Sequence, residues 1–225
     1  MPGVMIRIYN PDENGEGEIC VRGRNVFMGY LYLEKATWEA FDGEGYYHTG
    51  DKGRLDSDNN LVITGRIKEI LITSGGEKVE PQQIELAMQM ACPIVSHAIV
   101  VGEGQKFVSL LLTLKVIKDP YSGTFTRNLS PEATNFIKNK LKLSNVSSVE
   151  EVKNTPEMRD YINDCVERAN LKAINRVAKV KKWVILDEEL DVLSGELTPT
   201  YKVKRKYIMK KHEAKIAMLY AEPKL

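Results

Sequence analysis

The sequence lacks an apolar run long enough to cross a membrane. Its longest, around residues 108–114, is far shorter than the roughly 20 residues that a spanning helix needs. The N-terminal residues 1–7 also lack the apolar run of a secretory signal. We therefore expect a cytoplasmic protein, whose membrane contact, if it has any, is peripheral and on an internal membrane.

An excess of charge of one sign is missing too. The 32 basic and 31 acidic residues leave a formal net charge of +1. Nucleic-acid-binding domains normally carry a clear basic excess, so no nucleic-acid partner is expected. Hydrophobic residues make up 43% of the chain and charged residues 28%, a composition that supports a buried core and argues against disorder.

Cysteine is scarce, since the chain has only Cys20, Cys92 and Cys165. No pair has the spacing of metal ligands, so no metal site is expected. Three separated thiols fit a reducing, cytosolic compartment, and we expect each to pack as a small apolar side chain. The sequence also contains no Gly-x-x-x-x-Gly-Lys-Ser/Thr loop, which excludes a Walker-type phosphate site within it.

The first part of the chain is rich in strands and turns. Strands are expected at 4–9 and 18–22, and a hairpin at 53–56 and 61–64, each pair joined by Asn, Asp or Gly turn residues. A short helix is expected at 34–41. This stretch has the pattern of an edge of a larger β subdomain rather than of a complete one.

Strands and helices alternate after residue 65. Strands are expected at 67–73, 94–101 and 107–116, and the apolar run of the last one suits a strand buried on both faces. Pro81 suits the first turn of a helix that stops before Pro93. The fold class is therefore α+β, with a small α+β domain following the β-rich stretch.

Residues 119–182 are expected to form a mainly helical insertion in the second domain. Ser130 and Thr155 each precede a proline and an acid, which marks two helix starts. A strand at 183–186 and a final amphipathic helix at 205–219 follow. After Thr155, apolar residues recur at helical spacing and predict a buried helix face: Met158, Tyr161, Ile162, Cys165, Val166, Ala169, Ala173, Ile174 and Val177.

Two segments of the β-rich part carry chemistry. Gly17–Gly23, followed by Gly29-Tyr30, is most simply a glycine-punctuated strand region. In Tyr47-His48-Thr49-Gly50-Asp51, an acid after a glycine can accept both hydroxyls of a ribose, although a turn aspartate bonded locally is the alternative. His48 has no evident serine or cysteine nucleophile beside it, which favours a packed structural histidine over a base.

Two further segments lie in the second part. Arg66 offers a planar fork of donors for phosphate or ribose oxygens, and Gly75-Gly76 lets backbone approach a ligand closely. Lys202, after a Thr/Pro-rich loop, can bring a positive charge to a phosphate or carboxylate. The alternatives are a plain turn at Gly75-Gly76 and a solvated basic helix start at Lys202.

In order and spacing these segments resemble motifs of the adenylate-forming superfamily, which includes acyl-CoA synthetases, luciferases and the adenylation domains of peptide synthetases. Gly17-Glu18 through Gly29-Tyr30 resembles its GE(I/L)-x-x-x-G…GY segment, and residues 47–51 resemble its (W/Y)-x-H-T-G-D motif, with Tyr46 as the better match for the aromatic residue. Thr198-Pro199-Thr200-Tyr201-Lys202 resembles its P-x-x-G-K loop in the form typical of long-chain acyl-CoA synthetases. Residues 27–31, residues 110–115 and the insertion are similar to the bubblegum branch of that group.

The resemblance assigns roles to individual residues. It implies that Asp51 binds the ribose of ATP and AMP and that Arg66 contacts the nucleotide. It also implies that Lys202 binds ATP and AMP and is the catalytic lysine of acyl-adenylate formation. It implies further that Lys68, in the Gly65–Lys68 boundary motif, is the hinge of a mobile lid, while Gly75 and Gly76 line the passage for CoA.

The resemblance also implies a domain plan and a reaction. Residues 1–65 would be the C-terminal remnant of a large AMP-binding domain, and residues 66–225 the lid, with its insertion at about 119–182. The complete enzyme would join a long-chain fatty acid to CoA, converting ATP with Mg²⁺ to AMP and pyrophosphate.

The family's Ser/Thr/Gly-rich phosphate loop, its adenine-site segment and its magnesium acid have no match in the 225 residues. We therefore expect this chain to be incompetent alone. Two alternatives stay open: a non-catalytic truncated module that acts in binding or interaction, and an anionic-membrane patch made of Lys202, Lys204, Arg205, Lys206, Lys210 and Lys211.

Overall fold

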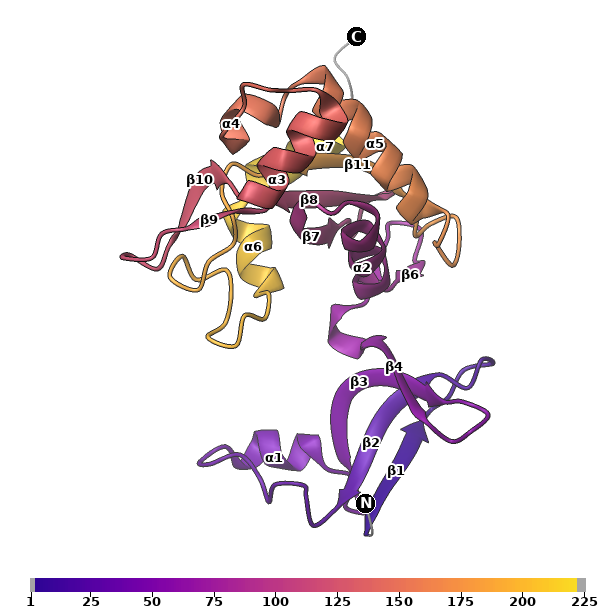
Figure 1. Cartoon of the computed structure of the whole chain (residues 1–225). Helices are drawn as coiled ribbons and strands as arrows, with labels where there is room; N and C mark the ends of the chain where they lie inside the picture. Colours follow the sequence, from indigo (N-terminus) through magenta and orange to yellow (C-terminus); the bar gives the residue numbers. More distant parts are fainter. Residues whose placement is uncertain (1–2, 222–225) are drawn as a thin grey trace. The chain divides into compact units, whose positions relative to one another are not determined.

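The structure, a computed structural model, describes residues 3–221. Its contacts divide the chain into two compact units, Met1–Ile70 (unit 1) and Leu71–Leu225 (unit 2), as Figure 1 shows. The mixture of sheets and helices confirms the α+β class. The expected boundary between a large AMP-binding domain and its lid, at residues 65 and 66, stays a prediction. None of the described helices is both long and apolar enough to span a bilayer.

Unit 1 is an antiparallel sheet of four strands in the order β1-β2-β3-β4, with α1 (Glu34–Ala40) between β2 and β3. The expected strands are present, and the helix begins and ends within one residue of its expected range. The strands are β1 (Val4–Tyr9), β2 (Gly17–Gly23), β3 (Tyr47–Leu55) and β4 (Leu61–Arg66).

β3 begins earlier than its sequence pattern indicates. The Tyr47–Asp51 motif therefore lies on a sheet strand and not on a turn. The strand accommodates it because Gly50 has a φ of +73°, which a side chain would strain, and because the pairing with β2 shifts register between Glu18 and Cys20. Tyr47 and His48 at the start of the motif pair with β2, and Asp51 at its end pairs with β4.

The chain between the two units differs from the expected strand at 67–73. Residues Ile67–Glu69 form a 3₁₀ turn, η1, and only Leu71–Ile72 form a strand, β5, which pairs with β6 (Lys78–Val79). The physical reason is burial: Leu71 and Val79 pack in the core, whereas Ile67 is exposed and gains nothing from a longer strand.

Unit 2 is built on a three-stranded sheet in the order β11-β8-β7. β7 (Val95–Val101) runs antiparallel to the central β8 (Val108–Leu114), and β11 (Val180–Ile185) runs parallel to β8. All seven residues of β8 are buried, which confirms the prediction of a strand covered on both faces.

Alternate residues of this sheet face two separate apolar clusters. Leu110 and Leu112 belong to a cluster with α2 (Pro81–Ala91) and α5 (Pro156–Asn170). Leu111 belongs to the other cluster, with the C-terminal helices α6 (Arg205–Lys211) and α7 (Glu213–Tyr220). A single long helix was expected at 205–219, but it breaks at His212, whose ring turns inward to bond Glu196.

The insertion begins as β structure, unlike the mainly helical segment expected from residue 119. β9 (Val116–Lys118) and β10 (Phe125–Leu129) form a hairpin, because Phe125 and Thr126 favour a strand beyond the Asp119–Gly123 turn. Three helical segments follow. They are α3 (Pro131–Phe136), continued by the π-helical η2 (Ile137–Leu141), then α4 (Val149–Val152) and α5.

Both predicted helix starts are confirmed. The Ser130 hydroxyl accepts a hydrogen bond from the N–H of Ala133, and the Thr155 hydroxyl accepts one from the N–H of Met158. The first six residues of the predicted stripe, from Met158 to Ala169, are buried on α5. The helix ends at Asn170, however, so Ile174 lies beyond it and is exposed.

Candidate functional site

Two of the three residues expected to bind nucleotide, Asp51 and Arg66, lie side by side. Asp51 on β3 is the cross-strand partner of Arg66 on β4, and Arg66 Nε lies 3.0 Å from Asp51 Oδ1. Both side chains remain partly exposed, at 30% and 46%. A carboxylate fixed by a cation but still open to solvent can accept ligand hydroxyls, whereas a fully enclosed pair could not.

Neighbouring residues hold Asp51 in place. The Thr49 hydroxyl accepts a hydrogen bond from the N–H of Asp51 at 3.0 Å and donates one to the carbonyl of Ile19 at 2.7 Å. The N–H of Gly50 donates to Glu18 Oε1 at 3.0 Å. The strand segment that carries Asp51 is therefore tied to β2 by both side-chain and backbone groups.

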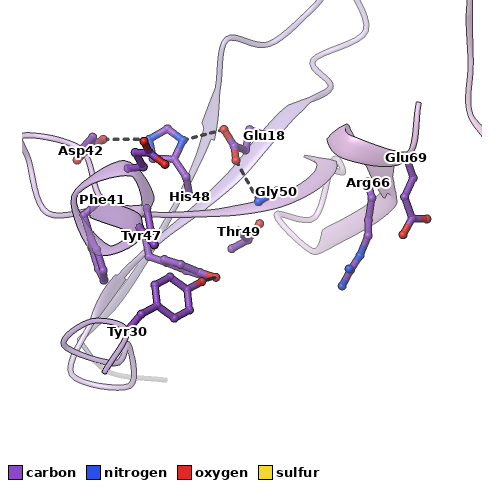
Figure 2. A pocket seen from close by; sticks show the side chains of 13 residues that line it. Glu18, Tyr30, Phe41, Asp42, Tyr47, His48, Thr49, Gly50, Arg66 and Glu69 are labelled. Carbon is purple, nitrogen blue, oxygen red and sulfur yellow. Dashed lines mark hydrogen bonds and ion pairs between the residues drawn. The ribbon is translucent and has the colours of Figure 1, made fainter. Parts of the chain in front are cut away.

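His48 is a structural member of this arrangement. Its Nδ1 lies 2.7 Å from Glu18 Oε2, and its Nε2 lies 3.8 Å from Asp42 Oδ2 (Figure 2). Tyr9 packs edge-on against the ring. With both ring nitrogens directed at carboxylates, His48 is a poor base for a substrate, which agrees with the packed histidine favoured by the sequence.

Glu18 also approaches a cysteine, so that Glu18, Cys20 and His48 offer three ligand-type atoms within 4.8 Å of one another. The sequence spacing of the cysteines gave no sign of this group, because its members come from two strands. Burial, and then the charge of Glu18, raise the pKa of Cys20 to about 11. The neutral thiol suits packing against His48, and the three cysteines are free and buried, as expected.

A pocket of 680 Å³ adjoins these residues within unit 1 (Figure 2). Its walls combine aromatic rings, carboxylates and one guanidinium, a mixture suited to a polar ligand with a flat apolar part. We call it the unit-1 pocket. Its residues include Glu18, Tyr30, Phe41, Asp42, Tyr47, His48, Thr49, Gly50, Arg66 and Glu69.

The other predicted site residues lie elsewhere in the chain. Lys68 is in η1, just before the boundary of the two units. Gly75 and Gly76 form the tip of the β5–β6 hairpin in unit 2, where Gly76 has a φ of +78° and its N–H donates to the carbonyl of Thr73 at 2.9 Å. This tip is exposed.

Lys202 lies on an exposed loop of unit 2. The Thr198 N–H donates to the Lys202 carbonyl at 2.8 Å, and the Lys202 N–H donates to the Thr198 hydroxyl at 3.0 Å. Tyr201 takes the left-handed conformation, with a φ of +59°. The Lys202 amine has no ion-pair partner within residues 3–221, so it is available to an anion from outside the loop.

A buried acid anchors this loop at its base. Glu196 is 2% exposed, and its carboxylate lies 3.1 Å from Lys211 Nζ, 3.1 Å from His212 Nε2 and 2.6 Å from the Ser194 hydroxyl. Burial alone would raise the pKa of Glu196, but bonds from these three partners lower it to about 2. Its carbonyl also accepts from the N–H of Lys204 at 2.8 Å, which closes the loop.

The sequence did not assign roles to Glu18 or Glu196. Both acids follow a glycine, in segments that resemble family motifs, and this is the only sequence signal that could have identified them. The alternative of an anionic-membrane patch loses two of its six charges to ion pairs. Arg205 pairs with Glu85 at 2.7 Å, and Lys211 pairs with Glu196.

The chain is similar to several known proteins. A family model described as the AMP-binding enzyme C-terminal domain matches residues 68–135. Human long-chain-fatty-acid–CoA ligase ACSBG1 is 42% identical over 226 residues, covering 100% of this chain and 31% of that protein. Chicken ACSBG2, another long-chain-fatty-acid–CoA ligase, is 42% identical over 225 residues, covering 99% of this chain and 29% of that protein. The chain thus spans about a third of the length of these relatives.

Solved structures show the same fold. The adenylation domain of a Mycobacterium chelonae carboxylate reductase matches with a TM-score of 0.73 at 19% identity, over 98% of this chain and 32% of that one. ATP-bound MatB from Rhodopseudomonas palustris matches with a TM-score of 0.60 at 21% identity, over 95% of this chain and 35% of that one.

Residues 68–135 therefore carry the C-terminal domain of AMP-binding enzymes, and the chain has the fold of adenylation domains. Along its whole length the chain is similar to part of the long-chain acyl-CoA synthetases of the bubblegum type, ACSBG1 and ACSBG2.

Proposed function

We propose that these residues serve as the C-terminal part of a long-chain fatty acid–CoA ligase that uses ATP with Mg²⁺ and CoA. The observation that carries the proposal is the Asp51–Arg66 ion pair, which sets a partly exposed carboxylate beside a guanidinium on adjacent strands. The 42% identity to human ACSBG1 along the whole chain supports the same reaction class.

In the first half-reaction, a carboxylate oxygen of the fatty acid attacks the α-phosphorus of ATP, and the bond to pyrophosphate breaks. Asp51 would accept the ribose hydroxyls, and Arg66 would both orient Asp51 and face the phosphate. Lys202 would stabilise negative charge between carboxylate and phosphate, because its amine is unpaired within the described residues and is carried on an exposed loop.

In the second half-reaction, the sulfur of CoA attacks the acyl carbonyl and AMP leaves. Lys202 is no longer needed, and the Gly75-Gly76 tip would face the site instead. Figure 1 shows β6, beside this tip, and α6, beside the Lys202 loop, on different sides of unit 2. Rotation of unit 2 at Lys68 would exchange the two, so that one domain movement orders both reactions.

A chimaera tests the proposed function. Residues 1–225 would replace the aligned 31% of human ACSBG1, and acyl-CoA formation from a long-chain fatty acid, ATP and CoA would be measured. We expect the chimaera to be active and the 225-residue chain alone to show no ATP–pyrophosphate exchange. A folded but inactive chimaera would contradict the ligase assignment, and would favour a non-catalytic binding module.

Replacing Asp51 with asparagine in the active chimaera is expected to weaken nucleotide binding. The change keeps the shape of the side chain but removes a charged acceptor and the pairing with Arg66. Hydrogen bonds to charged groups contribute about 1.5–3 kcal/mol, so the KM for ATP should rise roughly 10–100-fold. The matched control is Asp58→Asn on an exposed turn, which should leave KM unchanged; equal effects would refute the role given to Asp51.

A further inference from the structure

A second pocket lies in unit 2, and none of the residues assigned to the ligase reaction lines it. It has a volume of 420 Å³ and forms where α2, the π-helical η2 and α5 meet. Small-molecule sites typically measure roughly 300–1,000 Å³, so this volume suits a small ligand. We call it the unit-2 pocket.

The floor of the unit-2 pocket is apolar. Met90, Pro93, Phe136 and Tyr161 line it, and the rings of Phe136 and Tyr161 lie 5.3 Å apart. Met90 is 66% exposed at its edge. An exposed flexible thioether next to aromatic rings is a surface that adapts to an alkyl chain.

The charged residues of the pocket are all cations. Lys140 comes from η2, Arg168 from α5, and Lys172 from the turn after α5, and no carboxylate lines the pocket. None of the three has an ion-pair partner in the part of the chain that the structure describes. By contrast, four carboxylates line the unit-1 pocket: Glu18, Glu39, Asp42 and Glu69.

Two hydrogen bonds within the protein hold the guanidinium of Arg168 in position. Its guanidinium donates to the carbonyl of Ala91 at 3.0 Å and to the sulfur of Cys165 at 3.1 Å. Lys140 lies on the π-helical segment. Such segments are rare in proteins, but where they occur they are frequently found at functional sites. The pocket thus combines Arg168, which hydrogen bonds hold in place, with the lysines Lys140 and Lys172 and an apolar floor.

We propose that the unit-2 pocket binds a single-chain anionic amphiphile. The alkyl chain would lie on Met90, Pro93 and Phe136, and a phosphate or carboxylate head would contact Lys140, Arg168 and Lys172. A free fatty acid and a lysophospholipid share this chemistry. Met90 and Pro93 lie within the 68–135 match to the AMP-binding C-terminal domain, whereas the other four residues lie beyond it, in the insertion.

The test measures binding to the purified 225-residue chain by calorimetry. Dodecyl phosphate and dodecanoate would be titrated below their critical micelle concentrations, with dodecyl maltoside and inorganic phosphate as the uncharged and chain-free probes. We expect at least one of the anionic amphiphiles to bind at one molecule per chain and both reference probes to bind far more weakly. Preference for the phosphate would indicate a lysophospholipid, and preference for dodecanoate a fatty acid.

Charge reversal then locates the site. The double variant Lys140→Glu/Lys172→Glu should weaken binding at least about tenfold, because two charge-assisted contacts are lost. The matched control, Lys138→Glu/Lys179→Glu, changes two exposed lysines outside the pocket and should bind like the parent. Met90→Glu should also weaken binding, and thermal melting would verify that all variants fold.

Several results would overturn the proposal. Equal weakening in the two double variants would mean non-specific charge attraction. If inorganic phosphate bound as tightly as dodecyl phosphate, the alkyl chain would contribute nothing to binding, and the pocket would be a simple anion site. Binding to phosphatidylglycerol vesicles without binding of either monomeric amphiphile would indicate a membrane surface instead. Because the chain itself is tested, none of these outcomes depends on the ligase activity of the chimaera.

Discussion

Replacing Lys202 with alanine in the complete ligase is expected to slow acyl-adenylate formation by about 10²–10³-fold while largely sparing thioester formation from supplied acyl-AMP. The reason is geometric. The Lys202 amine extends from a loop that Thr198 and Tyr201 hold in one conformation, and no described carboxylate neutralises it. Its charge therefore matters only in the half-reaction in which carboxylate and phosphate approach each other.

The two half-reactions are measured separately. ATP–pyrophosphate exchange reports the first, and release of AMP from synthetic acyl-AMP with CoA reports the second. Lys206→Ala, on the same basic segment, is the matched control and should leave both rates near the parent values. Equal loss of both rates in the Lys202 variant would show that the lysine supports the fold or the lid movement, and not the chemistry of adenylation.

Replacing Glu196 with alanine is expected to destabilise unit 2 by about 3–5 kcal/mol, the usual effect of removing one partner from a buried charged group. Lys211 and His212 would lose their shared acceptor, and Ser194 would lose its bond. Urea unfolding measures the effect. Glu188→Ala is the control, because Glu188 is 58% exposed and its pair with Arg127 should contribute less than about 1 kcal/mol.

The same carboxylate makes stability depend on pH. The pKa of Glu196 is lowered from 4.5 to about 2 in the folded chain, so the folded state favours the ionised form. Its stabilisation is fully present above the unfolded pKa and disappears as pH falls through the folded one. The difference corresponds to about 3 kcal/mol, lost between about pH 4.5 and pH 2.

Glu196→Gln separates this effect from other acids. The amide preserves the side-chain volume but does not titrate, so the variant should lose a smaller part of its stability over the same pH range. An identical pH profile for variant and parent would mean that Asp187, whose pKa Lys153 and Lys215 also lower to about 2, controls acid unfolding instead.

Local patterns predicted the elements of the fold well where a single physical rule dominates. The hydroxyl caps at Ser130 and Thr155 and the continuous burial of β8 follow from hydrogen bonding and apolar runs within a few residues. The errors arose where partners distant in sequence decide the outcome. His212 breaks the last helix because its ring bonds Glu196, and no local pattern contains that bond.

The site shows the same division. Motif order identified Asp51, Arg66 and Lys202, but their roles, like those of Lys68, Gly75 and Gly76, stay predictions. The register that makes Asp51 and Arg66 cross-strand partners depends on a shift between Lys52 and Gly53, which no motif encodes. The anchoring acids were missed because a buried carboxylate and an exposed one look alike in a sequence.

The parallel pairing of β8 with β11 has a consequence for biogenesis. Val180 pairs with Val108, so residues 115–179 must be synthesised before β8 can gain its second neighbour. At roughly 5–20 residues per second, the ribosome needs several seconds for that stretch. During this time β8, five of whose seven residues are Val or Leu, has an open edge that can pair with another nascent chain. The length of the insertion therefore sets how long this edge of β8 stays open during synthesis.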